Sequence, residues 1–239
     1  MIFSLSSDDF SENQIQILKL LFDKDYLQQE LQNALSTTGS NLHYHLNRLK
    51  KYNLIRKEIV QKIGNARINR ISLNPSARQY IRKILRFKVK DYTLITGFGT
   101  LGTGYKLPDT VFQILREIYY PISRIVCFTS PDAIEKREEH QEQENLRKFD
   151  HFIEFPYEDY RNIESEFFQK VENILSVEMK SADIIIDLTP LSKLFSFKLL
   201  EMANKYYLPC VYLGINEEGN YELLSMSNMK IEGIIQPFK

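Results

Sequence analysis

Two short segments combine glycine, hydroxyl and charged residues in patterns suited to binding an anion. The first follows an apolar stretch at 92–96 and reads Gly97-Phe-Gly-Thr-Leu-Gly-Thr-Gly104. Glycines let the backbone approach a ligand closely, and exposed amides in such a loop can hold phosphate. The second, Asp187-Leu-Thr-Pro-Leu-Ser-Lys193, offers two hydroxyls and a positive charge after another apolar stretch. We therefore expect a site for an anionic ligand built from both segments.

The glycine spacing formally fits G-x-G-x-x-G, but a dinucleotide site is not expected. That fingerprint requires a helix that starts inside the motif and an acid about 20 residues later. Here the next helix is expected to begin near Pro108, and the following strand ends in Phe128-Thr-Ser130. For the second segment, the alternative is that Thr189 or Ser192 simply caps the following helix, with Pro190 near its first position. Such capping is compatible with ligand binding.

A third segment, residues 36–70, carries the polar and basic side chains expected of a DNA-binding surface. From Arg48 to Lys90 there are fourteen basic residues and one acid, Glu58. Residues 1–90 carry a net charge of +9 and the remainder −9, so the total of zero conceals a basic and an acidic half. Such asymmetry indicates a polyanionic partner for the basic half. A protein-interaction domain is the alternative for this half.

Helical spacing and turn residues predict the elements that would position these side chains. In the basic half we expect helices at 12–23, capped by Ser11, at 27–35 and at 39–51. A hairpin of strands 54–61 and 67–73, turning at 62–66, should follow, and then a helix from the Asn74-Pro-Ser76 cap to about 87. His43 and His45 do not share a helix face, so we expect surface polar contacts and no metal site.

The remainder alternates apolar strands with helical segments, which predicts an α/β fold with a mostly parallel sheet and helices on both faces. The expected strands are 92–96, 124–128, 151–155, 183–187 and 210–214, and the expected helices are 107–119, 131–149, 157–180 and 193–206. Hairpin additions are expected at 221–225 and 231–237, and a solvated acidic helix face at 138–144. The predicted domains are 1–88 and 89–239.

The first domain resembles archaeal and bacterial winged helix-turn-helix regulators. The residues that carry the resemblance are 36–55, which follow a pattern of the form xxHLxxLxxxGLI with Asn53 in the usual glycine position. Asn tolerates left-handed backbone. The resemblance implies double-stranded DNA as partner and a recognition helix near 39–51. The candidate DNA-binding residues are Thr37, Thr38, Ser40, Asn41, His43, Tyr44, Asn47, Arg48, Lys50, Lys51, Lys62, Asn65, Arg67 and Arg70.

The second domain resembles the CRISPR-associated Rossmann fold, or CARF, domains. These carry a glycine- or hydroxyl-containing loop after the first strand and a D-x-S/T-G-G-x-K/R motif after a later one. Asp187, Thr189 and Lys193 occupy matching places, whereas Pro190 and Leu191 replace the two glycines. The candidate ligand-binding residues are Gly97, Phe98, Gly99, Thr100, Leu101, Gly102, Thr129, Asp187, Thr189, Pro190, Ser192 and Lys193.

The combined resemblance implies a homodimeric transcription regulator that senses a cyclic oligoadenylate, such as tetra-adenylate. Two alternatives are a ring nuclease that cleaves this ligand and a DNA-binding adaptor whose α/β domain only dimerises. No independent catalytic signature is present, so no catalytic residue, cofactor or metal is assigned.

Cys127 and Cys210 lie in apolar runs, and we expect buried thiols on separate strands. No signal peptide or stretch of about 18 apolar residues is found, which predicts a cytoplasmic protein without membrane contact.

Overall fold

The computed structural model describes residues 7–64, 66–88, 91–154, 163–179, 182–189, 193–227, 229, 231 and 233–234. The chain divides into two compact units, Met1–Lys88 and Val89–Lys239. None of the helices in the described ranges is long and apolar enough to cross a membrane.

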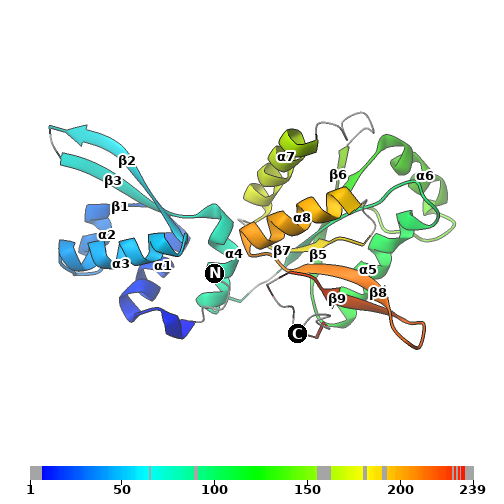
Figure 1. Cartoon of the computed structure of the whole chain (residues 1–239), viewed down its shortest axis with the longest axis horizontal. Coiled ribbons are helices and arrows are strands. Elements are labelled where there is room, and N and C mark those ends of the chain that lie inside the picture. The colour runs from blue at the N-terminus through cyan, green and yellow to red at the C-terminus, as the bar shows by residue number, and fades with distance from the viewer. Residues whose placement is uncertain are drawn as a thin grey trace. The chain divides into compact units, whose positions relative to one another are not determined.

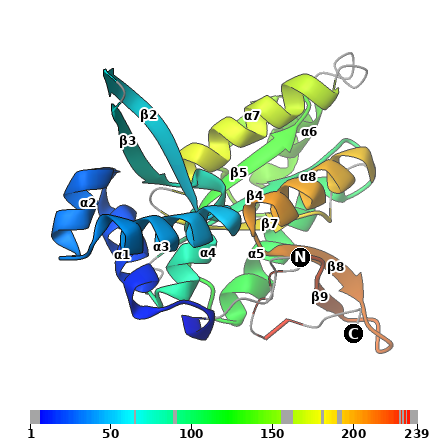
Figure 2. The same cartoon turned by 60° about the vertical axis from the view of Figure 1, so that its left-hand side comes forward.

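The first unit is a winged helix-turn-helix. Its main elements are α1 (Glu12–Asp23), β1 (Tyr26–Leu27), α2 (Gln28–Ala34), α3 (Gly39–Lys51), β2 (Ile55–Ile63), β3 (Ala66–Leu73) and α4 (Arg78–Ile84). The three strands form an antiparallel sheet in the order β1-β3-β2. β2 and β3 continue beyond the helices as a two-stranded wing (Figures 1 and 2).

Local hydrogen bonds explain where the helices of this unit begin and end. The Ser11 hydroxyl accepts from Gln14 N at 3.4 Å, and Gln14 Oε1 accepts from Ser11 N at 3.0 Å, a reciprocal capping box that confirms the predicted start of α1. Asn53 has the predicted left-handed backbone, with a φ of 56°. Asn53 N and Leu54 N donate to Lys50 O and Leu49 O, which is the Schellman ending of α3.

The wing and the last helix differ in detail from expectation. Lys62 lies within β2, opposite Arg67, and not in the turn. β2 ends at Ile63 and β3 begins at Ala66, so the turn is shorter than the expected 62–66. Asn74 caps a short 3-10 turn at Pro75–Ala77 by accepting from Ser76 N at 3.3 Å, and α4 then ends at Ile84 instead of about 87.

The second unit is a six-stranded α/β sheet in the order β6-β5-β4-β7-β8-β9. The strands are β4 (Tyr92–Gly97), β5 (Ile122–Thr129), β6 (His151–Glu154), β7 (Asp183–Asp187), β8 (Cys210–Ile215) and β9 (Tyr221–Ser225). All neighbours are parallel except β8 and β9, which form an antiparallel hairpin. This confirms the predicted mostly parallel sheet.

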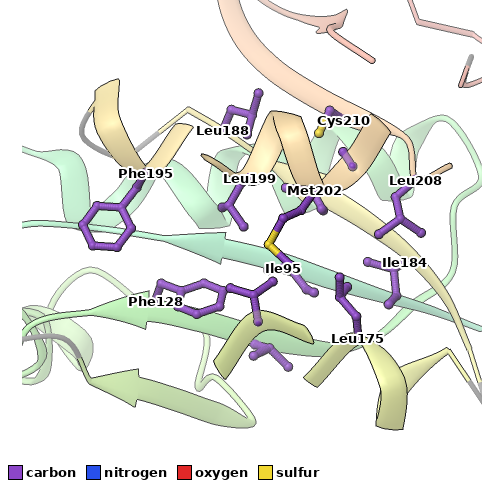
Figure 3. Packing of buried hydrophobic residues seen from close by; sticks show 14 of the residues in the cluster. Ile95, Phe128, Leu175, Ile184, Leu188, Phe195, Leu199, Met202, Leu208 and Cys210 are labelled. Atoms are coloured by element: carbon purple, nitrogen blue, oxygen red, sulfur yellow. The ribbon is translucent and has the colours of Figure 1, made fainter. Parts of the chain in front are cut away.

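Helices cover both faces of this sheet, as predicted. They are α5 (Leu107–Glu117), α6 (Pro131–Gln141), α7 (Ile163–Glu178) and α8 (Lys193–Tyr206). On one face, Phe195, Leu199 and Met202 of α8 pack with α7 over Ile95 and Phe128 (Figure 3). On the other face, α5 packs over Leu94 and Ile185, and Ala133 of α6 packs beside Cys127.

Two expectations at the ends of elements are wrong. α6 ends at Gln141, not at 149, and Asn145 takes a left-handed backbone with a φ of 52°. The 138–144 run is therefore not one solvated helix face. Beyond β9, residues 231, 233 and 234 lie outside any strand, and 232 and 235–237 of the predicted hairpin addition lie outside the described residues. Cys127 and Cys210 are buried free thiols on β5 and β8, as predicted.

Candidate nucleic-acid interface and candidate ligand site

Helix α3 separates an apolar face from a polar one. Leu42, His45, Leu46 and Leu49 recur at the spacing of one helix face and are buried. Thr38 begins the helix by accepting from Asn41 N at 3.3 Å, and Thr37 Oγ1 accepts from Asn41 Nδ2 at 2.9 Å. The first turn therefore presents hydroxyls and amides to solvent.

Most of the candidate DNA-binding residues lie on the exposed surface of α3 and the wing. The exposed ones are Thr38, Ser40, Asn41, His43, Tyr44, Asn47, Lys50, Lys51, Lys62, Arg67 and Arg70. Thr37 and Arg48 are half-buried, and Asn65 lies outside the described residues. Arg48 donates to Asp9 O at 3.3 Å, so part of its guanidinium is engaged within the unit.

The charge of this surface is not neutralised locally. None of Lys50, Lys51, Lys62, Arg67 and Arg70 forms an ion pair with a residue that the structure describes. Lys57 of β2 lies near α3, where burial lowers its pKa and the like charge of Lys50 lowers it further. Crowded cations of this kind are stabilised by a polyanion.

His45 is not a surface residue, which corrects the expectation for it. Its side chain is 7% exposed, and Nε2 lies 3.3 Å from Asn13 Nδ2 of α1. Burial lowers the pKa of His45, and Arg48 lowers it further. The His45 ring thus joins α3 to α1, whereas His43 is exposed as predicted.

The two candidate ligand segments of the second unit begin at the same edge of the sheet. β4 and β7 are parallel neighbours, with Ile95 opposite Ile186. From β4 the chain moves to β5 and β6 on one side and then returns to β7 on the other. The segments after β4 and β7 therefore flank the point where strand order reverses, which is where open α/β sheets bind ligands.

A buried carboxylate connects these segments. Asp187 is fully buried, Oδ2 accepts from Thr96 Oγ1 at 2.7 Å, and Oδ1 accepts from Thr189 N at 2.9 Å. Thr189 Oγ1 in turn accepts from Leu213 N of β8 at 2.8 Å. Desolvation raises the pKa of Asp187 to about 6, although the hydrogen bonds from Thr189 and Thr96 oppose the shift.

Several of the candidate ligand-binding side chains lie behind the binding edge. Asp187, Phe98 and Thr129 are buried, and Thr129 Oγ1 donates to Phe98 O at 2.9 Å. These side chains are buried within the unit, and their assignment as ligand-binding residues stays a prediction. The Thr189 hydroxyl accepts a hydrogen bond from Leu213 N of β8.

The remaining candidate residues face solvent or lie outside the described ranges. Leu101 and Gly102 are exposed, Gly99 and Thr100 are half-buried, and Gly97 is the buried last residue of β4. Lys193 is exposed at the first position of α8. Pro190 and Ser192 lie outside the described residues. Lys136 of α6 contacts the glycine-containing segment, and no sequence pattern singled it out.

No protein-family model matches the sequence, and no curated protein matches it. Among solved structures, the chain is similar to reduced HlyU from Vibrio cholerae N16961, with 25% identity and a TM-score of 0.24. That match covers 27% of this chain and 62% of HlyU, so the chain spans less than two thirds of that protein.

Two further similarities are with the adhesin competence repressor AdcR from Streptococcus pyogenes and with Bacillus subtilis PadR in complex with operator DNA. For AdcR the identity is 12% over 58% of this chain and 81% of that one, with a TM-score of 0.28. For PadR the identity is 12% over 69% of this chain and 93% of PadR, with a TM-score of 0.28. The winged-helix assignment made above rests on the order and pairing of the elements in this chain.

Proposed function

We propose that this protein is a ligand-responsive, DNA-binding transcription regulator. The observation that carries the DNA-binding half is the basic, exposed surface of α3 and the wing. A helix of this length fits the major groove, where side chains of its first turn reach base edges. The cations of the wing would contact phosphates and fix the position of the protein on the duplex.

In this proposal the second unit is a CARF-like sensor for a cyclic oligoadenylate, tetra-adenylate being the first choice. What supports it is that the glycine-containing loop follows β4 and Lys193 begins the helix after β7, the two neighbouring strands at which the strand order reverses. Lys193 stands at the N-terminus of α8, and both its charge and the helix end favour a phosphate. The resemblance to CARF domains adds the class of ligand and the association with CRISPR systems.

A second copy of the chain would complete the ligand site. Leu101, in the glycine-containing loop, is 87% exposed, and Phe197, one turn after Lys193 on α8, is 70% exposed. Bare apolar side chains beside a polar site are typical of surfaces that another protein covers. A two-fold dimer would place two such sites together and present two recognition helices to a symmetric operator.

Calorimetric titration with cyclic tetra-adenylate and cyclic hexa-adenylate tests the sensor. We expect binding of one ring per dimer and at least tenfold weaker binding by Lys193→Ala, because one phosphate contact is lost in each protomer. Lys148→Ala is the matched control, since Lys148 is an exposed lysine near the edge strand β6. Absence of binding to either ring would contradict the sensor. Chromatography of the recovered ligand would reveal the ring-nuclease alternative as linear products.

A further inference from the structure

Lys136 of α6 donates to two carbonyls of the glycine-containing loop. Its Nζ lies 2.6 Å from Thr100 O and 3.2 Å from Gly102 O. The ammonium also lies 5.6 Å from the ring centroid of Tyr105, which closes the same loop. Lys136 is half-buried, so its charge is held against the loop and is not free in solvent.

A third carbonyl of the loop is bound from the same part of the unit. Phe98 O accepts from Thr129 Oγ1, at the end of β5, at 2.9 Å. The carbonyls of alternate residues therefore face the same side of the loop: that of residue 98 faces β5, and those of residues 100 and 102 face α6. The loop's other carbonyls at 101 and 103 accept from Gly104 N and Lys106 N, within the loop itself.

This alternation decides where the loop amides point. The described chain has no cis peptide bonds, and in a trans peptide the N–H points opposite to the preceding carbonyl. The amides of Gly99, Leu101 and Thr103 therefore point away from β5 and α6. Among the residues that the structure describes, none accepts a hydrogen bond from these three amides. Leu101, Gly102 and Thr103 are exposed and Gly99 is half-buried, so this part of the loop is accessible to solvent.

We propose that Lys136 is a positioning residue that orders this loop so that the amides of Gly99, Leu101 and Thr103 bind a phosphate of the ligand. Backbone amides that point outward from one side of a loop can together form a concavity that binds an anion. The inference rests on the proposed sensor function and adds to it which groups recognise the phosphate. A loop carbonyl that loses its cationic donor is free to turn outward, where it would repel a phosphate.

The test compares Lys136→Met, which keeps the aliphatic stem, with Lys136→Arg, which keeps the donor and the charge. Without ligand, ¹⁵N relaxation of the full-length protein measures the order of the loop amides. We expect order parameters of about 0.85 at residues 99–103 in the wild type and in Lys136→Arg, and values below about 0.6 in Lys136→Met. The control Lys148→Met removes an exposed lysine elsewhere in the unit and should leave the loop ordered.

Titration with cyclic tetra-adenylate and with inorganic phosphate then tests recognition. We expect downfield shifts of the amide protons of Gly99, Leu101 and Thr103, and at least tenfold weaker binding of the ring by Lys136→Met, with recovery in Lys136→Arg. An ordered loop in Lys136→Met, or ring binding that leaves these amide shifts unchanged, would overturn the inference. If the wild type binds neither probe, the proposed function and the recognition step fail, while the relaxation data separately decide whether Lys136 orders the loop.

Discussion

Asp187 is a buried acid that the two candidate ligand segments share, through Thr96 and Thr189. Burial raises its pKa from 3.8 to about 6, so the folded protein binds this proton more tightly than the unfolded chain does. The resulting stability is fully present below pH 3.8 and is lost as the pH rises through about 6. At 1.36 kcal/mol per pKa unit the effect is about 3 kcal/mol.

Asp187→Asn should remove this pH dependence, because an amide can bind Thr189 N and Thr96 Oγ1 without ionising. We expect the free energy of unfolding of the variant, measured by urea denaturation, to vary less between pH 4 and 7 than that of the wild type. If the free energy of unfolding varied with pH in the same way for both proteins, ionisation of Asp187 would not affect stability and the prediction would be wrong.

At the scale of single residues, sequence spacing identified candidate positions better than it identified their roles. It predicted that Thr189 and Lys193 follow a buried strand, and both do. The bond from Leu213 N to Thr189 and the bonds from Lys136 to Thr100 and Gly102 join residues 24 to 36 positions apart. Contacts of that kind depend on tertiary packing, which periodicity in a single sequence does not contain.

At the scale of elements, the wing is expected to contact the DNA backbone through Arg67 and Arg70. Each lost phosphate contact reduces the slope of log K against log salt by about 0.9. The double variant Arg67→Ala/Arg70→Ala should therefore bind duplex DNA more weakly, with a slope shallower by about 2 in anisotropy titrations. Lys19→Ala/Lys24→Ala, in and just after α1, is the charge-matched control. A salt slope unchanged from the wild type would remove the wing from the interface.

Helix and strand periodicity predicted most elements, and the exceptions have identifiable causes. β1 is too short, with two residues, to show any alternation, and it exists because β3 offers it pairing partners. α6 was expected to continue through its polar residues. The residues after Gln141 instead contact other parts of the unit. Glu144 pairs with Lys106 at 2.7 Å, and Arg147 N donates to Asp109 at 2.8 Å. A tertiary ion pair and a tertiary hydrogen bond thus override helix propensity here.

At the scale of the whole molecule, the two units carry opposite net charge and would perform different tasks. The basic unit would bind DNA whether or not ligand is present, whereas the acidic unit would bind an anion only through the local charges at its switch point. In the proposed regulator these tasks are coupled, because a ring shared by two protomers would favour one arrangement of the dimer. Coupling between sites is commonly worth about 1–3 kcal/mol, or about 5- to 150-fold in affinity.

The most direct test of this account is the affinity for duplex DNA, captured from a genomic fragment pool, with and without saturating cyclic tetra-adenylate. We predict that the ligand changes the dissociation constant by at least about fivefold in the wild type. Lys193→Ala should keep the ligand-free DNA affinity and lose the response. DNA binding that is identical with and without bound ring would contradict the claim that this protein is a ligand-responsive regulator.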